Sequence, residues 1–263
     1  MKVQSAATTL SVVASLLIVA GASRPGQADP PAAGGPSLLE RALAGPMAKS
    51  EEIVFAVRVG GRDHWYGNFG FYSDRPQRAA FGEGGRLCRL NLRTGKLTIL
   101  LEDAKGGVRD PCVHYDGRKV LFSYRKGGTS VYHLYEIGAD GANLRQLTDG
   151  DDDDIEPVYV PDGGIVFISA RCRRFVPCWY TRVAVLARCE GNGRNVRLLS
   201  SNAEQENTPW VLPDGRILYM RWEYVDRNQL LFHHLWTINP DGTGVMTYRS
   251  EEHTSELQSH LCI

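Results

Sequence analysis

The sequence has no surplus of charge of either sign. Of its 263 residues, 30 are lysine or arginine and 30 are aspartate or glutamate. Binding to nucleic acid regardless of base sequence and attachment to an anionic membrane surface both depend on clustered positive charge. The balance therefore argues against both classes of protein, and we expect no nucleic-acid partner.

Motifs of several enzyme classes are missing as well. The sequence contains no G-x-S-x-G elbow of serine hydrolases, no H-E-x-x-H zinc motif and no P-loop. It also lacks C-x-x-C-H, the string to which c-type haem is attached. The sequence therefore assigns no catalytic and no cofactor-binding residues, and it leaves open whether the chain is part of an enzyme.

The first 28 residues have the pattern of an export signal. Lys2 is followed by a mostly apolar stretch over residues 6–22, and small residues offer cleavage sites after Ala22 or Ala28. An uncleaved membrane anchor is the alternative, although the apolar stretch is short for a spanning helix. We expect a periplasmic or secreted protein that has no membrane contact after signal cleavage.

Two further segments lie outside the predicted folded region. Residues 29–50 have the composition of a flexible linker, with a short helix over residues 37–44. Residues 249–263 are polar, lack any strand pattern and resemble a translated sequencing adapter, with a natural helical tail as the alternative. We expect the folded region to span residues 51–248 and to be a truncated part of a longer protein.

Internal repeats dominate residues 51–248. Three segments place a proline five residues before an Asp-Gly pair, which an apolar strand then follows. The prolines of these copies, Pro111, Pro157 and Pro209, are 46 and 52 residues apart. Each copy precedes a second motif, a strand with a glycine-containing turn, and an earlier second motif begins at Leu87 without a clear first half.

The composition of each repeat predicts two β-hairpins. Asp-Gly pairs adopt the positive-φ conformations of tight hairpin turns, and the flanking β-branched and aromatic runs suit a buried pleated surface. Two hairpins per repeat give a four-stranded sheet, which is the blade of a β-propeller. The sequence therefore predicts an all-β fold, a partial β-propeller of about four four-stranded blades.

The repeat carries a family resemblance. Leu147-Thr148, the proline at 157 and Pro161-Asp162-Gly163 follow each other as in the TolB-like (WD40-like) propeller repeat. The longer strings, such as RDPCVHYDGRKVLFSY and NTPWVLPDGRILYMRWEYVDR, resemble the middle domain of the hydrazine synthase alpha-subunit family. This resemblance implies a propeller that stands beside haem-bearing domains, so a c-type haem is an expectation for the full-length protein and not for this chain.

The cysteines suggest a disulfide. In an exported protein thiols are candidates for pairing, and Cys172 and Cys178 flank the insertion that lengthens one repeat. The pair would staple this insertion, although Cys189 competes as a partner. A zinc site formed by these three thiols is the alternative.

A run of four carboxylates precedes one repeat, at Asp151, Asp152, Asp153 and Asp154. Calcium prefers oxygen ligands in such loops, so these residues are candidate metal ligands. The run lacks the spaced pattern that wraps a single ion, and a solvated turn is the favoured interpretation.

Aromatic and charged residues in two inter-strand segments are candidates for a binding rim at the mouth of the propeller. These rim candidates are His64, Trp65, Tyr66, Trp222, Glu223, Tyr224 and His233. A loop covering the core is the alternative for the first three, and cross-strand ion pairs are the alternative around Trp222. His133 and His234 occupy equivalent repeat positions, which favours a packing or hydrogen-bonding role within the blade.

Two functions remain open at the level of sequence. The first is an exported binding or scaffolding module, in which blade-connecting loops hold a protein partner or a small-molecule ligand. The second is the propeller part of a larger haem-dependent oxidoreductase whose catalytic region lies beyond residue 248. Because a fold alone does not determine function, the repeats do not decide between them.

Overall fold

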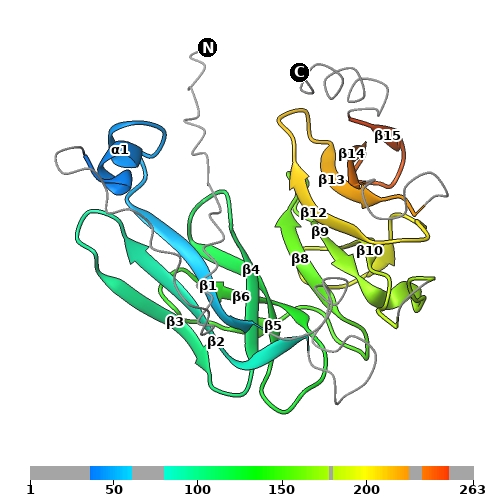
Figure 1. Cartoon of the computed structure of the whole chain (residues 1–263), viewed down its shortest axis with the longest axis horizontal. Helices are drawn as coiled ribbons and strands as arrows, with labels where there is room; N and C mark the ends of the chain where they lie inside the picture. The colour runs from blue at the N-terminus through cyan, green and yellow to red at the C-terminus, as the bar shows by residue number, and fades with distance from the viewer. Residues whose placement is uncertain (1–35, 61–79, 178–179, 225–232, 249–263) are drawn as a thin grey trace, which may run out of the picture.

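Figure 1 shows the fold of the chain, taken from a computed structural model that describes residues 36–60, 80–177, 180–224 and 233–248. A helix, α1 (Leu38–Ala44), precedes the first strand where the sequence predicts a short helix. Ser37 and Glu40 cap its first turn reciprocally, and none of its residues is buried. Among the described residues no helix is long and apolar enough to cross a membrane.

The rest of the described chain forms four antiparallel sheets. The first consists of β1 (Glu52–Gly60), β2 (Phe81–Asn91) and β3 (Leu97–Asp103). The second consists of β4 (Gly107–Val113), β5 (Lys119–Arg125), β6 (His133–Gly138) and β7 (Arg145–Gln146). The third consists of β8 (Asp154–Tyr159), β9 (Ile165–Ser169), β10 (Val185–Cys189) and β11 (Arg197–Leu198). The fourth consists of β12 (Glu206–Val211), β13 (Ile217–Trp222), β14 (His233–Ile238) and β15 (Met246–Thr247).

The sheets follow one another in chain order, from β1–β3 to β12–β15 (Figure 1). In the last three sheets the strands are hydrogen-bonded in sequence order, and the first strands β4, β8 and β12 contact one another. We call β4, β8 and β12 the inner strands, because they lie side by side along the propeller axis. The predicted partial β-propeller of four blades is confirmed, with three described strands in the first blade.

The predicted Asp-Gly turns are confirmed by the backbone. Gly117, Gly163 and Gly215 each have a φ between 71° and 88° in the turn that joins the first two strands of a blade. These turns need a residue that tolerates positive φ, which glycine does without a steric penalty.

Each inner strand contains a bulge just before its repeat proline. Asp110, Glu156 and Thr208 have φ values of 54°, 53° and 51°, and the pairing register shifts at each of them. Non-glycine residues adopt this conformation rarely. We call these three the bulge residues. Each of them directly precedes a repeat proline, so the prolines mark the positions of the bulges.

The bulge residues link successive blades. The carboxylate of Asp110 accepts a hydrogen bond from the backbone N–H of Glu156 at 3.2 Å, and that of Glu156 accepts one from the N–H of Thr208 at 2.5 Å. Buried Arg109 donates to both carboxylates, at 2.5 Å to Asp110 and 3.1 Å to Glu156. The axis of the propeller is thus a chain of polar contacts that runs from one inner strand to the next.

The apolar core lies between neighbouring sheets. Phe122 and Leu121 are consecutive residues of β5, yet Phe122 packs in a cluster with Leu87 of the first sheet and Leu121 in one with Phe167 of the third. Alternate side chains of a strand face opposite sides, so the second blade buries one face against the first sheet and the other against the third. This packing explains why single blades depend on the repeat.

Candidate functional site

One end of the sheets gathers the connections between second and third strands and those between successive sheets. Antiparallel strands place these two kinds of connection at the same end. We call this end the loop face, and its described segments are residues 104–106, 126–132, 148–153, 170–184, 199–205 and 223–224. The rim candidates His64, Trp65 and Tyr66 lie in the sequence between β1 and β2, outside the described residues.

The remaining rim candidates flank the β13–β14 connection. Trp222 is 1% exposed, and its ring stacks on that of His233 with centroids 5.6 Å apart and an interplanar angle of 6°. Tyr224 meets the same Trp222 ring edge-on at 5.4 Å. The structure therefore brings three of the predicted residues together, with Glu223 between Trp222 and Tyr224 in the chain, and it places Trp222 beneath the surface.

The run of aspartates is not a solvated turn, so this interpretation was wrong. Asp152 and Asp154 are buried, whereas Asp151, the first residue of the run, is exposed. The side chain of Asp152 forms ion pairs with Arg173 at 3.0 Å and with Arg182 at 2.7 Å. Both arginines come from the insertion between β9 and β10, whose contacts a local sequence pattern does not reveal.

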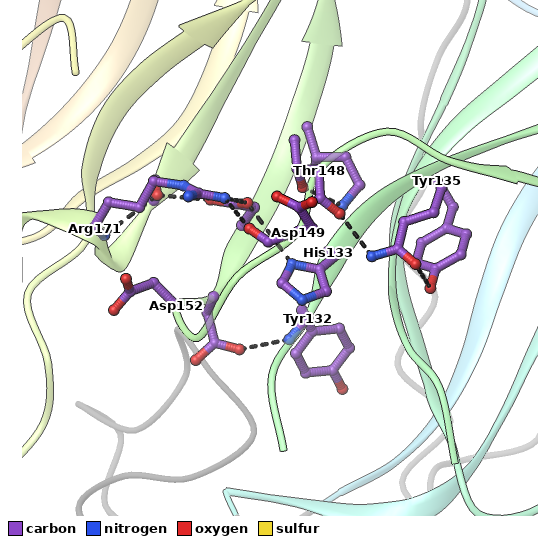
Figure 2. Close-up of polar contacts among 12 residues, drawn as sticks. Tyr132, His133, Tyr135, Thr148, Asp149, Asp152 and Arg171 are labelled. Atoms are coloured by element: carbon purple, nitrogen blue, oxygen red, sulfur yellow. Dashed lines mark hydrogen bonds and ion pairs between the residues drawn. The ribbon is translucent and has the colours of Figure 1, made fainter. Parts of the chain in front are cut away.

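The other buried aspartate organises the start of β8. Asp154 accepts hydrogen bonds from Ser169 at 2.7 Å and from the guanidinium of Arg171 at 2.6 Å, and His133 Nδ1 lies 3.8 Å from its Oδ2 (Figure 2). Burial alone would raise the pKa of Asp154, but the nearby His133 and the hydrogen bonds from Arg171 and Ser169 hold it below its usual value. Asp154 therefore remains a carboxylate close to His133.

The four aspartates point to different partners. The remaining one, Asp153, accepts a hydrogen bond from the backbone N–H of Tyr132 at 2.8 Å. Among the described residues we find no group of three or more histidine, cysteine, aspartate or glutamate side chains that could hold a metal ion. The geometry thus gives the candidate calcium ligands other roles, in the joints between blades.

The predicted equivalence of His133 and His234 is confirmed by the strand registers. His133 pairs with Tyr124 in the second sheet, and His234 pairs with Arg221 in the fourth. His133 is only 12% exposed, and its ring lies between Asp154 and a cavity on the loop face. His133 is therefore both packed within its blade, as its repeat position predicts, and part of the cavity wall.

The cavity has a volume of about 410 Å³. Its lining comes from β2, from the ends of β5 and β6 with their connection, and from the β7–β8 connection, so it lies between the first two sheets beside the link to the third. The side chains that define its chemistry are Glu83, Thr129, Ser130, His133 and Asp151. The volume is within the range of small-molecule pockets, roughly 300–1,000 Å³. We call it the loop-face pocket.

The exposed groups of the loop-face pocket are carboxylates and hydroxyls. Glu83, Asp151, Thr129 and Ser130 are all exposed to solvent. A carboxylate accepts hydrogen bonds and attracts positive charge, whereas a hydroxyl both donates and accepts. The pocket therefore suits a small ligand that carries an amine together with hydroxyl groups.

Sequence reasoning missed the residue that supports this pocket from below. Arg125 is 1% exposed, and its guanidinium donates hydrogen bonds to the carbonyl oxygens of Lys105 at 2.8 Å and Thr129 at 3.1 Å. These bonds fix two loops of the loop face to the end of β5. The sequence did hold a signal for Arg125, because Arg58 has the same position near the end of β1 as Arg125 has at the end of β5.

Asp103 fixes the same loops from the end of β3. It accepts hydrogen bonds from the hydroxyl of Tyr124 and from the backbone N–H of Gly127, both at 2.7 Å. Burial opposes ionisation of Asp103, but these bonds outweigh it and lower the pKa to about 2. The frame of the pocket therefore stays charged and ordered across the physiological pH range.

The cysteine pair predicted from the sequence is described only at one end. Cys172 ends a short 3₁₀ helix, η2 (Ala170–Cys172), and its free thiol donates to the carbonyl of Val183 at 3.1 Å. Cys178 lies outside the described residues, so the Cys172–Cys178 disulfide stays a prediction. Cys189, the competing partner, is a buried free thiol whose pKa burial raises to about 12.

Comparison with known proteins supports the resemblance seen in the repeats. No family model matches the sequence. Over 85 residues the chain is 35% identical to hydrazine synthase subunit alpha of Kuenenia stuttgartiensis, a match that covers 32% of this chain and 10% of that protein. The solved hydrazine synthase of the same organism superposes with a TM-score of 0.60, at 19% identity, over 84% of this chain. The two proteins share a fold.

The likeness to hydrazine synthase concerns a part of that protein. The superposition covers 35% of the solved hydrazine synthase chain. TolB from Acinetobacter baumannii superposes with a TM-score of 0.47 at 15% identity, over 62% of this chain and 37% of TolB. At 19% identity the superposition on hydrazine synthase shows the propeller fold alone and leaves activity, substrates and partners to be proposed.

Proposed function

We propose that the chain is a propeller binding module of an exported protein, and that its loop-face pocket holds a ligand through hydrogen bonds and ion pairs. The observation that carries the proposal is the pocket of about 410 Å³ between the first two sheets and the β7–β8 connection. The ligand chemistry that fits is an amine with neighbouring hydroxyl groups, which is offered by a small amino alcohol or by a lysine side chain of a partner protein. The protein thus uses rigid blades to position a polar site on its connecting loops.

The support for this chemistry comes from the charge around the pocket. Glu83 and Asp151 both lie at its edge, while the guanidinium of Arg125 is taken up by two carbonyl groups. Arg125 also lines the pocket, but it is buried, so the exposed charged groups of the lining are carboxylates. The imidazole of His133, on the inner wall, provides NMR signals that report occupancy.

Ethanolamine is the probe that tests this proposal, because it is the smallest molecule with both groups. Titration into the full chain should shift the NMR signals of the His133 imidazole, whereas sodium acetate at equal ionic strength should not. Glu83→Gln and Asp151→Asn should each weaken the response at least threefold. Asp214→Asn, an exposed carboxylate at the opposite end of the sheets, is the matched control and should leave it unchanged. Equal responses to ethanolamine and acetate would contradict the proposal.

Export is the second part of the proposed function. Its support is the charged start and apolar stretch of residues 1–28. A fusion of residues 1–50 to alkaline phosphatase, which is active only outside the cytoplasm, should give an active reporter, and removal of residues 6–22 should abolish the activity. An inactive full fusion would show that the segment is not an export signal.

A second candidate function is the propeller part of a larger haem-dependent oxidoreductase. It is favoured by the 35% identity to hydrazine synthase subunit alpha. The residues of this chain do not fit covalent haem attachment: the sequence has no C-x-x-C-H, and the described thiols of Cys88 and Cys189 are buried. A c-type haem would have to be bound by another region of the full-length protein. Sequencing the gene beyond the codon for Tyr248 tests this candidate, since a C-x-x-C-H in the continuation would support it and a stop codon after one further blade would contradict it.

A further inference from the structure

The first sheet corresponds to the second, third and fourth strands of the other blades. Ala56 of β1 pairs with Leu87 of β2, as Ser123 of β5 pairs with Leu134 of β6. Leu87 and Leu134 begin equivalent copies of the second repeat motif. Strand β1 therefore has the position of β5, and the position of an inner strand alongside β1 is filled by no described residue.

The contacts of Arg58 indicate which kind of segment fits the inner-strand position alongside β1. Because β1 matches β5, Arg58 is the counterpart of Arg125, which pairs with Gly107 of the inner strand β4 and donates to the carbonyl oxygen of Lys105 just before it. Arg125 thus holds the segment that enters the inner strand. The Nη1 atom of Arg58 is buried and has no hydrogen-bond acceptor among the described residues.

The surroundings of Arg58 favour a negatively charged occupant. Its guanidinium lies over the ring of Phe81, 4.9 Å from the centroid, and Arg109 lies over the same ring at 5.6 Å. Burial and the nearby charge of Arg109 lower the pKa of Arg58. Whereas Arg109 has Asp110 and Glu156 as partners, no described carboxylate forms an ion pair with Arg58.

The series of bulge residues indicates which residue of the occupant would carry the negative charge. Asp110 accepts the N–H of Glu156, and Glu156 accepts the N–H of Thr208, so each bulge side chain serves the next blade. A segment placed alongside β1 would contribute the bulge residue that precedes Asp110 in this series. The three known members stand before proline at positive φ and carry side-chain oxygens.

We propose that the inner edge of β1 is a docking site for an extended polypeptide segment with an acidic residue before a proline, and that Arg58 binds this segment as Arg125 binds the entry to β4. Such a segment adds a fourth strand to the first sheet by main-chain hydrogen bonds, which is β-augmentation. The side chain before the proline continues the series of bulge residues, and its charge offsets that of Arg58. This site is on the axis and is distinct from the loop-face pocket.

A synthetic peptide with the sequence of residues 152–161 (DDDIEPVYVP) is the probe, because it contains the bulge residue and proline of an existing inner strand. Added to the full chain, it should slow hydrogen exchange at least tenfold for those β1 amides between Ile53 and Arg58 that do not bond to β2. Arg58→Met should weaken peptide binding at least tenfold, measured by fluorescence anisotropy of the labelled peptide. Arg86→Met, which changes an exposed arginine of β2, is the matched control and should leave binding unchanged.

A peptide with lysine in place of its glutamate provides an independent arm on the unaltered protein, should Arg58→Met disturb folding. This peptide should bind at least tenfold more weakly than the original. The proposal is overturned if the β1 amides that do not bond to β2 are already protected before peptide is added, if protection appears only on the loop face, or if the lysine peptide binds equally well.

Discussion

The carboxylate of Asp110 accepts a hydrogen bond from the backbone N–H of Glu156, 3.2 Å away, across the junction of two blades. The bulge makes this contact available, because a positive φ at Glu156 places its N–H outside the ladder of its own sheet. The same device operates between Glu156 and Thr208. Successive blades are therefore aligned by specific polar bonds at the axis as well as by the apolar packing between their faces.

Replacing Glu156 should separate its roles as hydrogen-bond acceptor and as charge. Burial and the nearby Asp110 raise the pKa of Glu156 against the pull of Arg109. Glu156→Leu leaves the N–H of Thr208 and part of the buried Arg109 without a partner, so we expect a loss of about 3–5 kcal/mol in the free energy of unfolding. Glu156→Gln keeps an acceptor and should cost about 1–2 kcal/mol. Urea denaturation measures both, and equal losses would show that the acceptor contributes nothing.

Stability should fall with rising pH because of Asp153. Burial raises the pKa of this residue to about 7, whereas in an unfolded chain it is about 3.9. Between these values the folded state binds the proton more tightly, so the free energy of unfolding decreases as pH rises from about 4 to about 7. Asp153→Asn keeps an oxygen for the N–H of Tyr132 without a charge, and it should be more stable than the natural protein by about 1–3 kcal/mol at pH 8.

The next blade supplies a matched control for this prediction. Gln205 accepts the N–H of Ala184 at 2.8 Å, as Asp153 accepts that of Tyr132. Gln205→Glu places a carboxyl group in the same kind of joint, so it should add a loss of stability with rising pH. Denaturation midpoints at pH 5 and pH 8 measure both variants, and a pH dependence unaltered in Asp153→Asn would contradict the assignment.

Two turn glycines should respond differently to the same substitution. Gly117 and Gly193 have φ values of 71° and 86°, but a Cβ at Gly117 meets open space while one at Gly193 meets the backbone oxygen of Leu147 in the preceding blade. Gly117→Ala should cost only the conformational strain, about 1–2 kcal/mol. Gly193→Ala adds a backbone clash and should cost at least twice as much in thermal or urea denaturation. Equal losses of stability would mean that the backbone around Gly193 and Leu147 can shift without cost to admit the methyl group.

The insertion between β9 and β10 is where the predicted disulfide can be tested. In protein recovered from an oxidising compartment, alkylation without reductant should leave Cys172 and Cys178 unmodified, and a peptide map should find them linked. Reduction should increase hydrogen exchange in residues 170–184 and leave β5 unchanged. Alkylation of Cys172 before reduction would contradict the disulfide. It would show that Cys172 remains a thiol, the form in which it donates a hydrogen bond to the carbonyl of Val183.

The sheets could be predicted from the sequence because their determinants are local. Gly117 and Gly163 follow aspartates in turns that must have positive φ, and the apolar strands after them follow within a few residues. The repeat spacing then implied blades. The bulge at Glu156 could not be predicted in the same way, since its positive φ is stabilised by partners 46 and 52 residues away, Asp110 and Thr208.

The candidate site was predicted less completely for a related reason. Asp152 and Asp154 read as a solvated run because their arginine partners, Arg171 and Arg182, come from an insertion with no repeat counterpart. The loop-face pocket likewise combines residues that are far apart in the sequence, such as Glu83 and Asp151, and only Asp151 among its carboxylates was a sequence candidate. Sequence patterns located the loops, whereas the contacts between loops required the structure.

A crystal structure of the full chain grown with ethanolamine shows directly whether the loop-face pocket binds a ligand. We predict the ammonium group within hydrogen-bond distance of the carboxylates of Glu83 or Asp151 and the hydroxyl group near Thr129 or Ser130. The crystals should be grown at an ethanolamine concentration that saturates the NMR titration. A pocket that holds no ethanolamine under this condition would contradict the proposal.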